Sequence, residues 1–230
     1  MTTTLITGAN KGLGREVARR LLADGHDVWV AARDAARGAE TAAVLGARFV
    51  ALDVTDDASV AAAVEGVAAA GGLDVLINNA GIVGTRRPVA EITAEDIGEV
   101  LDTNVLGIVR VTQAFLPLLE RSANPVIVNI SSGMGSLAVT GDPSRLESTL
   151  ISLGYATSKT AVNMLTTQYA KALPGIRINA VDPGYTATDL NGHRGTQTVE
   201  EGTDAIVTMA KIDASGPTGT FVDRHGAVPW

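Results

Sequence analysis

Tyr155 and Lys159 stand four positions apart in a stretch of helical character, which places a phenol and an ammonium on one helix face. An unperturbed tyrosine has a pKa of about 10, too high for easy proton exchange at neutral pH. A fixed cation nearby is expected to stabilise the phenolate and lower that pKa. Such a pair could protonate a carbonyl under reduction or deprotonate an alcohol under oxidation. The alternative is a core tyrosine beside a surface lysine.

Two further groups of polar residues follow buried runs. Ser131 and Ser132 end the apolar run 125–130, where a hydroxyl could hydrogen-bond a substrate oxygen or simply form a turn. The sequence Asn-Asn-Ala-Gly at 78–81 ends another run, and its side chains are expected to tie neighbouring loops together. Asn104 interrupts a helical pattern although Asn is a poor helix former, which marks it as a candidate functional residue.

A glycine-rich turn, Thr-Gly-Ala-Asn-Lys-Gly-Leu-Gly at 7–14, separates the first predicted strand from the first predicted helix. Glycine permits a tight turn and close approach of a ligand to the backbone. The free N–H groups and the dipole of the following helix favour a pyrophosphate. The turn lacks the Gly-Lys-Ser/Thr ending of a nucleoside-triphosphate P-loop, because Arg15 and Glu16 follow it. The position of the turn predicts a dinucleotide site.

The end of the second predicted strand indicates which dinucleotide is preferred. NAD-binding folds carry Asp or Glu about 20 residues after the glycine turn, where it meets the ribose 2′-hydroxyl. This chain has Arg33 there, with Arg37 close by and Lys11 in the turn itself. A guanidinium would bind a 2′-phosphate. The sequence therefore predicts NADPH or NADP⁺, the alternative being that both arginines are solvated surface residues.

Composition excludes several classes of function. The 230 residues carry a net charge of −7, which disfavours general nucleic-acid binding, and 46% are hydrophobic, as in a globular protein. The absence of cysteine removes disulfides, thiolate catalysis and cysteine-ligated metals. The three histidines are scattered, so no metal site is expected. No export signal or membrane span is recognised, and we expect a cytoplasmic protein without a membrane partner.

Short apolar runs alternate with longer helical stretches along the chain, as in a parallel sheet with helical crossovers. We expect one domain over 1–230. The predicted strands are 5–7, 27–32, 48–52, 74–78, 125–130, 176–181 and 219–222, and the clearest helices are 12–23 and 200–211. Three long irregular stretches, 81–93, 133–153 and 184–198, follow predicted strands. Ligands bind beyond the carboxyl ends of such strands, so these stretches are expected to form the substrate pocket.

Taken together, these motifs make the sequence resemble the short-chain dehydrogenase/reductase family. The matching features occur in the family's order over residues 3–190: Thr7-Gly8-x3-Gly12-x-Gly14, Asp53-Val54, Asn78-Asn79-Ala80-Gly81, Asn104, Ser132, Tyr155-x3-Lys159 and Pro183-Gly184-x3-Thr188. The resemblance implies a Rossmann-type, doubly wound α/β fold, with a parallel sheet of about seven strands and helices on both faces.

The resemblance also implies a role for each matching residue. Tyr155 would exchange the proton, Ser132 would polarise the carbonyl, and Lys159 would lower the pKa of Tyr155 and bind ribose. Asn104 would hold a water that links Lys159 to solvent. The implied cofactor-binding set comprises Gly8, Asn10, Lys11, Gly12, Leu13, Gly14, Arg33, Arg37, Asp53, Val54, Asn79, Ala80, Gly81, Tyr155, Lys159, Pro183, Gly184, Thr186 and Thr188.

Within the family the chain is most similar to NADPH-dependent carbonyl reductases, through 10–14, 32–38 and the C-terminal stretches 216–221 and 229–230. It departs from the family at Asp182, where Asn often precedes Pro-Gly. The segment between Ser132 and Tyr155 is longer than in many members, and its apolar residues could wall a pocket or only pack the loop down. Its intermediate length leaves a monomer, a homodimer and a homotetramer open.

The function expected from the sequence is NADPH-dependent reduction of a ketone or aldehyde to an alcohol, with the proton from Tyr155. The partner would be a small carbonyl or alcohol substrate. Two alternatives remain open: an alcohol dehydrogenase working in the oxidative direction, and a non-catalytic NADP(H)-sensing protein. Epimerases and dehydratases of related fold usually carry a larger C-terminal substrate domain.

Overall fold

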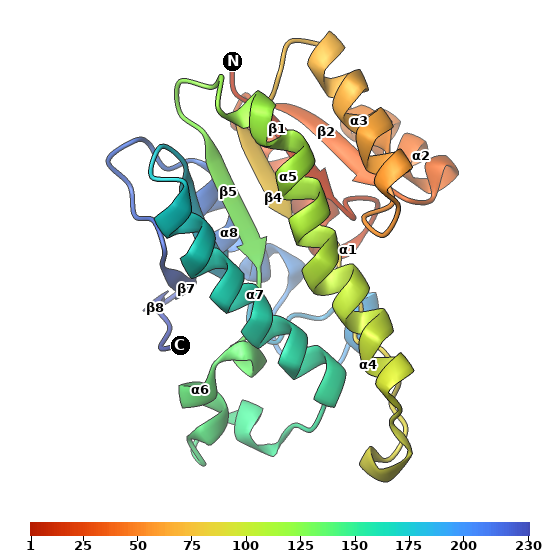
Figure 1. Cartoon of the computed structure of the whole chain (residues 1–230), viewed down its shortest axis with the longest axis vertical. Helices are drawn as coiled ribbons and strands as arrows, with labels where there is room; N and C mark the ends of the chain where they lie inside the picture. Colours follow the sequence, from red (N-terminus) through yellow and green to blue (C-terminus); the bar gives the residue numbers. More distant parts are fainter.

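A computed structural model describes residues 1–230 and contains one eight-stranded sheet (Figure 1). The strand order is β3-β2-β1-β4-β5-β6-β7-β8, with β8 alone antiparallel to its neighbour. The order reverses between β1 and β4, which is where doubly wound sheets bind ligands. The strands are β1 Thr3–Thr7, β2 Asp27–Ala32, β3 Arg48–Ala51, β4 Val75–Asn78, β5 Val126–Ile130, β6 Arg177–Val181, β7 Phe221–Asp223 and β8 Gly226–Ala227.

Helices cover both faces of the sheet because residues of the central strands alternate between two apolar clusters. Ile6 and Ile77 face the cluster made with α1, α2 and α8, whereas Leu5 and Leu76 face the cluster made with α3, α5 and α7. The helices are α1 Gly12–Ala23, α2 Ala35–Leu45, α3 Asp57–Ala69, α4 Ala94–Leu101, α5 Gly107–Leu119, α6 Leu137–Gly141, α7 Leu153–Ala172 and α8 Val199–Ala210. No helix is long and apolar enough to cross a membrane.

The Rossmann-type sheet predicted from the sequence is confirmed, and seven of its strands are parallel as expected. The bounds of β2 and α1 match the predicted 27–32 and 12–23, and other bounds shift by one or two residues. The added strand β8 follows the tight turn Arg224–His225, a pairing that two residues could not reveal by pattern. The stretches predicted to be irregular contain short helices: α6 and the 3-10 turns Val89–Glu91, Gly133–Gly135, Leu146–Thr149 and Asp189–Asn191.

The segment between β5 and α7 packs beside the C-terminal residues as a small unit of its own. Val139 of α6 meets Ala180, Phe221 and Val228 in a separate apolar cluster. The Ser136 hydroxyl donates to the carbonyl of Pro229 at 2.6 Å, and the Ala138 N–H donates to that of Trp230 at 3.2 Å. Figure 1 shows α6 beyond the arrowhead of β5, on the ligand-binding edge of the sheet.

Candidate active site

The carboxyl ends of β1, β4, β5 and β6 are neighbours in the sheet, so the residues that follow these strands gather at one edge. This edge carries the glycine turn after β1, the Asn-Ala-Gly sequence after β4, Ser132 after β5 and Pro183-Gly184 after β6. Helix α7 contacts both β5 and β6 and brings Tyr155 and Lys159 to the same place. The predicted groups are thus assembled from five segments.

Tyr155, Ser132 and Lys159 lie together at this edge. The Ser132 hydroxyl lies close to the Tyr155 oxygen, where it acts to lower the pKa of the phenol. The Lys159 ammonium lies 5.5 Å from the centre of the Tyr155 ring. It donates a hydrogen bond of 2.7 Å to the carbonyl of Ile130, the last residue of β5. Lys159 is buried, with 5% of the residue's surface exposed, so α7 and β5 hold its charge at a fixed place.

Burial dominates the ionisation of this pair. Burial raises the pKa of Tyr155 to about 12; the Ser132 hydroxyl opposes this rise, and the charge of Asp182 adds to it. Burial also lowers the pKa of Lys159 to about 8, against the attraction of Asp182. The predicted lowering of the Tyr155 pKa by Lys159 is therefore not observed, because burial outweighs the neighbouring groups and the ammonium is engaged by Ile130. Tyr155 keeps part of its surface accessible and is protonated at neutral pH.

Asn104 occupies a π-helical turn, Asp102–Leu106, that joins α4 to α5. Its carboxamide accepts the N–H of Ile82 at 2.8 Å and donates to the carbonyl of Ile82 and the hydroxyl of Ser158, both at 2.9 Å. A Cβ on Gly81 would lie 3.3 Å from Asn104 Oδ1 and 3.8 Å from Lys159 Nζ. Asn104 thus holds the loop after β4 against α7, and its oxygen and the Lys159 ammonium face the same glycine.

The glycine turn after β1 has the backbone its sequence predicts. Gly8 and Gly12 have φ values of 65° and 54°, which a side chain would strain. A Cβ on Gly14 would lie 2.6 Å from Asn79 Nδ2, so only glycine fits there. Helix α1 begins after Lys11 without a side-chain cap, which leaves the first N–H groups of the helix free for a ligand.

Asn79 ties two loops together, as the sequence analysis expected, whereas Asn78 joins two neighbouring strands. Asn78 donates from its side chain to Asn129 Oδ1 at 2.9 Å, across β4 and β5. Asn79 donates from its side chain to the carbonyl of Thr7 at 2.8 Å, and the N–H groups of Asn79 and Ala80 both donate to the Thr7 hydroxyl. The segment 79–81 therefore lies directly against the glycine turn.

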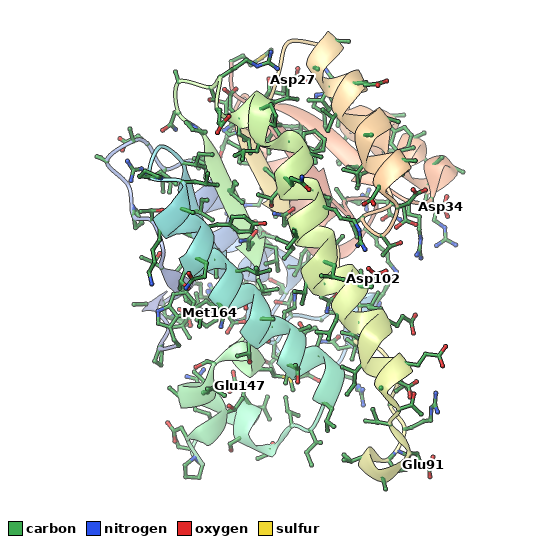
Figure 2. All side chains as sticks on the ribbon, viewed as in Figure 1. Asp27, Asp34, Glu91, Asp102, Glu147 and Met164 are labelled. Carbon is green, nitrogen blue, oxygen red and sulfur yellow. The ribbon has the colours of Figure 1, made fainter.

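Arg33 and Arg37 project into solvent at the carboxyl end of β2, with side chains 79% and 71% exposed. Arg37 pairs with Asp34, which caps α2 and is labelled in Figure 2. The Arg33 guanidinium lies 3.9 Å from Asp53, whose carboxylate also accepts hydrogen bonds from Thr55. Burial raises the pKa of Asp53, but Thr55 and then Arg33 hold it below its usual range. Both guanidinium groups are exposed to solvent, and each has an aspartate as its neighbour.

Other predicted cofactor residues have different surroundings. Lys11 pairs with Asp189 at 3.0 Å, on the loop after β6. Val54 is buried against Gly107, and Asn10 accepts the Thr41 hydroxyl through its carbonyl. The hydroxyl of the buried Thr186 is committed to the carbonyl of Pro183 at 2.9 Å, a structural contact.

The loop after β6 closes over the glycine turn. Gly184 has a φ of 69°, and the methyl group of Thr188 lies 3.8 Å from a Cβ built on Gly12. Sequence reasoning marked Asp182 only as a departure from the family, and it did not single out Glu147. Both carboxyl groups approach Gly133, directly after Ser132. The sequence alone gives no sign that these two carboxyl groups approach Gly133. No three His, Asp or Glu side chains gather closely enough to hold a metal ion.

Comparison with known proteins identifies the family. The model of the short chain dehydrogenase family matches residues 2–198. Short-chain dehydrogenase/reductase 1 of Saponaria officinalis is 34% identical, over 98% of this chain and 95% of its own. Salutaridine reductase of Papaver bracteatum is 30% identical, over 97% and 94%. The crystal structure of NADPH-bound carbonyl reductase from chicken fatty liver superposes with a TM-score of 0.89 at 31% identity, covering 100% of this chain and 99% of the other. The chain belongs to the short-chain dehydrogenase/reductase family of oxidoreductases.

Proposed function

We propose that this protein reduces a ketone or aldehyde to an alcohol with NADPH as the hydride donor. The observation that carries the proposal is a protonated Tyr155 hydroxyl beside the Ser132 hydroxyl, at the edge where the glycine turn lies. A proton donor next to a nucleotide site is what carbonyl reduction needs. In reduction the protonated Tyr155 would give up its proton, and in oxidation the same group would have to start as a base.

The residues at this edge fit a nicotinamide dinucleotide. The uncapped N-terminus of α1 and the glycine turn would hold the pyrophosphate, and Lys159 would hold a ribose hydroxyl. Arg33 and Arg37 would bind the 2′-phosphate that distinguishes NADPH from NADH. NADPH bound there would supply the hydride, whereas the chain supplies the proton and the hydrogen bonds.

The protein's own groups act on the carbonyl oxygen. Ser132 and Tyr155 are hydroxyl donors that would both reach the oxygen and stabilise the negative charge that develops on it. Tyr155 then gives up its proton to form the alcohol. The buried Lys159 ammonium, fixed by Ile130, would stabilise the phenolate left behind while the lysine remains charged.

The names of the similar proteins support a reductase function. The relatives from Saponaria officinalis and Papaver bracteatum are named as a dehydrogenase/reductase and a reductase. The chicken structure is a carbonyl reductase with NADPH bound. These names concern the relatives, and for this chain they support the choice of coenzyme.

The test is oxidation of NADPH, followed by loss of nicotinamide absorbance, across a panel of ketones, aldehydes and diketones, with NADH in parallel. We expect carbonyl-dependent oxidation that is faster with NADPH. If an alcohol panel with NADP⁺ gives turnover and the carbonyl panel gives none, the oxidative alternative replaces this proposal. Tight NADPH binding with no turnover in either direction would support the sensor alternative.

A further inference from the structure

Asn163 is a buried residue of α7, one helical turn after Lys159, with 4% of its surface exposed. Its side-chain oxygen accepts the hydroxyl of Ser131 at 2.5 Å, and its side-chain nitrogen donates to the carbonyl of Gly135 at 3.1 Å. A backbone carbonyl can only accept, so the nitrogen must face Gly135 and the oxygen must face Ser131. The next residue, Met164, labelled in Figure 2, is 60% exposed, so Asn163 lies on the inner side of α7.

The two hydrogen-bond partners of Asn163 lie on either side of Ser132 in the chain. Ser131 precedes it, directly after β5, and Gly135 ends the 3-10 turn 133–135 that follows it. The carboxamide of Asn163 therefore holds the backbone before and after Ser132. It does so from α7, the helix that carries Tyr155.

The turn 133–135 in turn orients the Ser132 hydroxyl. The N–H of Met134 donates to the Ser132 hydroxyl oxygen at 3.2 Å. A hydroxyl can accept two hydrogen bonds and donate one, so this contact uses an acceptor position and leaves the proton available to another oxygen. The hydroxyl lies close to the Tyr155 oxygen, where a substrate carbonyl would be bound. A displaced turn would remove the N–H that sets this orientation.

The turn also packs directly on the backbone of α7. A Cβ built on Gly135 would lie 2.6 Å from the carbonyl carbon of Lys159, so only glycine allows this approach. The Ser131 hydroxyl lies 3.3 Å from the carbonyl oxygen of the same lysine. The chain around Ser132 and the backbone of Lys159 are thus in contact, and the side chain of Asn163 bonds across that contact.

We propose that Asn163 is a positioning residue: its carboxamide fixes the turn 133–135 relative to α7 and so sets the place of the Ser132 hydroxyl. It acts through Ser132, without a contact to the reacting atoms. Because α7 also carries Tyr155, the same two hydrogen bonds keep the two hydroxyl groups in register with each other. The catalytic part of the inference rests on the proposed function, whereas the hold on the turn does not.

Three variants separate this role from a general loss of stability. Asn163→Ala removes the carboxamide, and Asn163→Leu removes it but keeps a branched side chain of similar shape, which separates the hydrogen bonds from the packing. The matched control is Asn179→Ala, which removes another buried carboxamide. Asn179 lies on β6, donates to the carbonyl of Pro217 at 2.8 Å and accepts the N–H of Thr220 at 3.1 Å. Its loss would loosen the C-terminal segment and leave the turn 133–135 in place.

The first measurement is amide hydrogen exchange of the peptide that covers 131–136, followed by mass spectrometry. The N–H groups of Gly135 and Ser136 donate within the turn at 2.8 and 3.0 Å, so opening of the turn controls their exchange. We expect exchange about tenfold faster in both Asn163 variants and within about twofold of wild type in Asn179→Ala. Wild-type exchange in Asn163→Leu would overturn the proposal. If neither Asn163 variant folds, Ser131→Ala, which removes one partner of the carboxamide, should give exchange at least about threefold faster, and an unchanged rate would overturn the proposal.

The kinetic readout is a double-mutant cycle with Ser132→Ala, using a carbonyl compound that the panel identifies and kcat per NADPH-binding site. Asn163→Ala should lower kcat about 10- to 100-fold, since a misplacement of about 1 Å can cost about 10²-fold, with the Kd of NADPH unchanged within about twofold. In the Ser132→Ala background the same substitution should lower kcat less than about threefold, because the hydroxyl that it positions is gone. Asn179→Ala should leave kcat within about twofold in both backgrounds.

Two kinetic results would overturn the positioning role. One is an Asn163→Ala effect of the same size with and without the Ser132 hydroxyl, which would mean that the two residues act independently. The other is a kcat for Asn163→Ala equal to that of wild type. If no carbonyl is reduced at all, the proposed function fails, while the exchange result still decides whether Asn163 holds the turn.

Discussion

The two sides of the catalytic edge are built in different ways. The proposed nucleotide side consists mainly of backbone, with glycines at φ values of 65° and 54° and an uncapped helix start, and it adds two exposed arginine side chains. The substrate side consists of side chains from distant parts of the chain, with Val139 packed on Phe221 and Asp182 facing Glu147 across Gly133. A site formed by the backbone requires particular residues at fixed spacing. A site formed by packed side chains can be built by many different sequences.

The largest effect is expected where the two sides meet, at Tyr155. Tyr155→Phe removes the proton donor and keeps the ring, so turnover should fall about 10²- to 10⁴-fold, the usual contribution of a general acid. NADPH binding, measured by coenzyme fluorescence, should change little because the nucleotide side is untouched. Ser132→Ala serves as a matched loss of one hydroxyl and should also lower turnover. Full activity in Tyr155→Phe would remove this residue from the mechanism.

A change confined to the nucleotide side should separate the two coenzymes. Arg33→Asp replaces a donor to the 2′-phosphate by a repelling charge, and hydrogen bonds to charged groups contribute about 1.5–3 kcal/mol. The KM for NADPH should therefore rise at least about tenfold, with a much smaller change for NADH. Arg121→Asp, at the opposite end of the sheet after α5, is the control for net charge. An unchanged coenzyme ratio would contradict the assignment of the 2′-phosphate site.

The pH dependence of reduction tests the buried lysine. Burial lowers the pKa of Lys159 to about 8, so the ammonium is present below that pH and is lost as pH rises through it. We expect kcat/KM for reduction to fall above pH about 8, while Tyr155, with a pKa of about 12, stays protonated over this range. Because the fold disfavours the charged lysine, its contribution to stability decreases as pH falls from 10.5 to about 8. A flat kcat/KM profile up to pH 9.5 would contradict this account.

The smallest effect is expected at the contact that joins the two sides on the surface. Lys11 and Asp189 form an ion pair with side chains 58% and 55% exposed. Exposed pairs contribute about 0–1 kcal/mol, so Asp189→Asn should change the Kd of NADPH by only about two- to threefold. Titration of wild type and variant at low and high salt measures this. A tenfold change would mean that the loop after β6 controls access to the nucleotide turn.

The backbone of the proposed nucleotide side could be predicted from the sequence, because its determinants are local. Gly14 must be glycine, since Asn79 leaves no room for a Cβ, and β2 ends at Ala32 with Arg33 following it, as expected. The ionisation of Tyr155 could not be predicted, because it depends on burial by residues far away in the chain. The approach of Asp182 and Glu147 to Gly133 could not be predicted for the same reason. In the sequence 34 residues lie between these two, and only the folded segment brings them near the same glycine.

The π-helical turn at 102–106 has a consequence for the long helix that contains it. Helix α4 packs against α7, whereas α5 packs against α3. In an α-helix each residue turns the chain by about 100°, so the wide turn rotates the apolar stripe of α5 relative to that of α4. Deleting one residue there would change the rotation of α5 about the helix axis relative to α4. Both α4 and α5 would remain helical, but α4 could no longer pack against α7 while α5 packs against α3. Asn104 would also leave the position from which it holds Ile82.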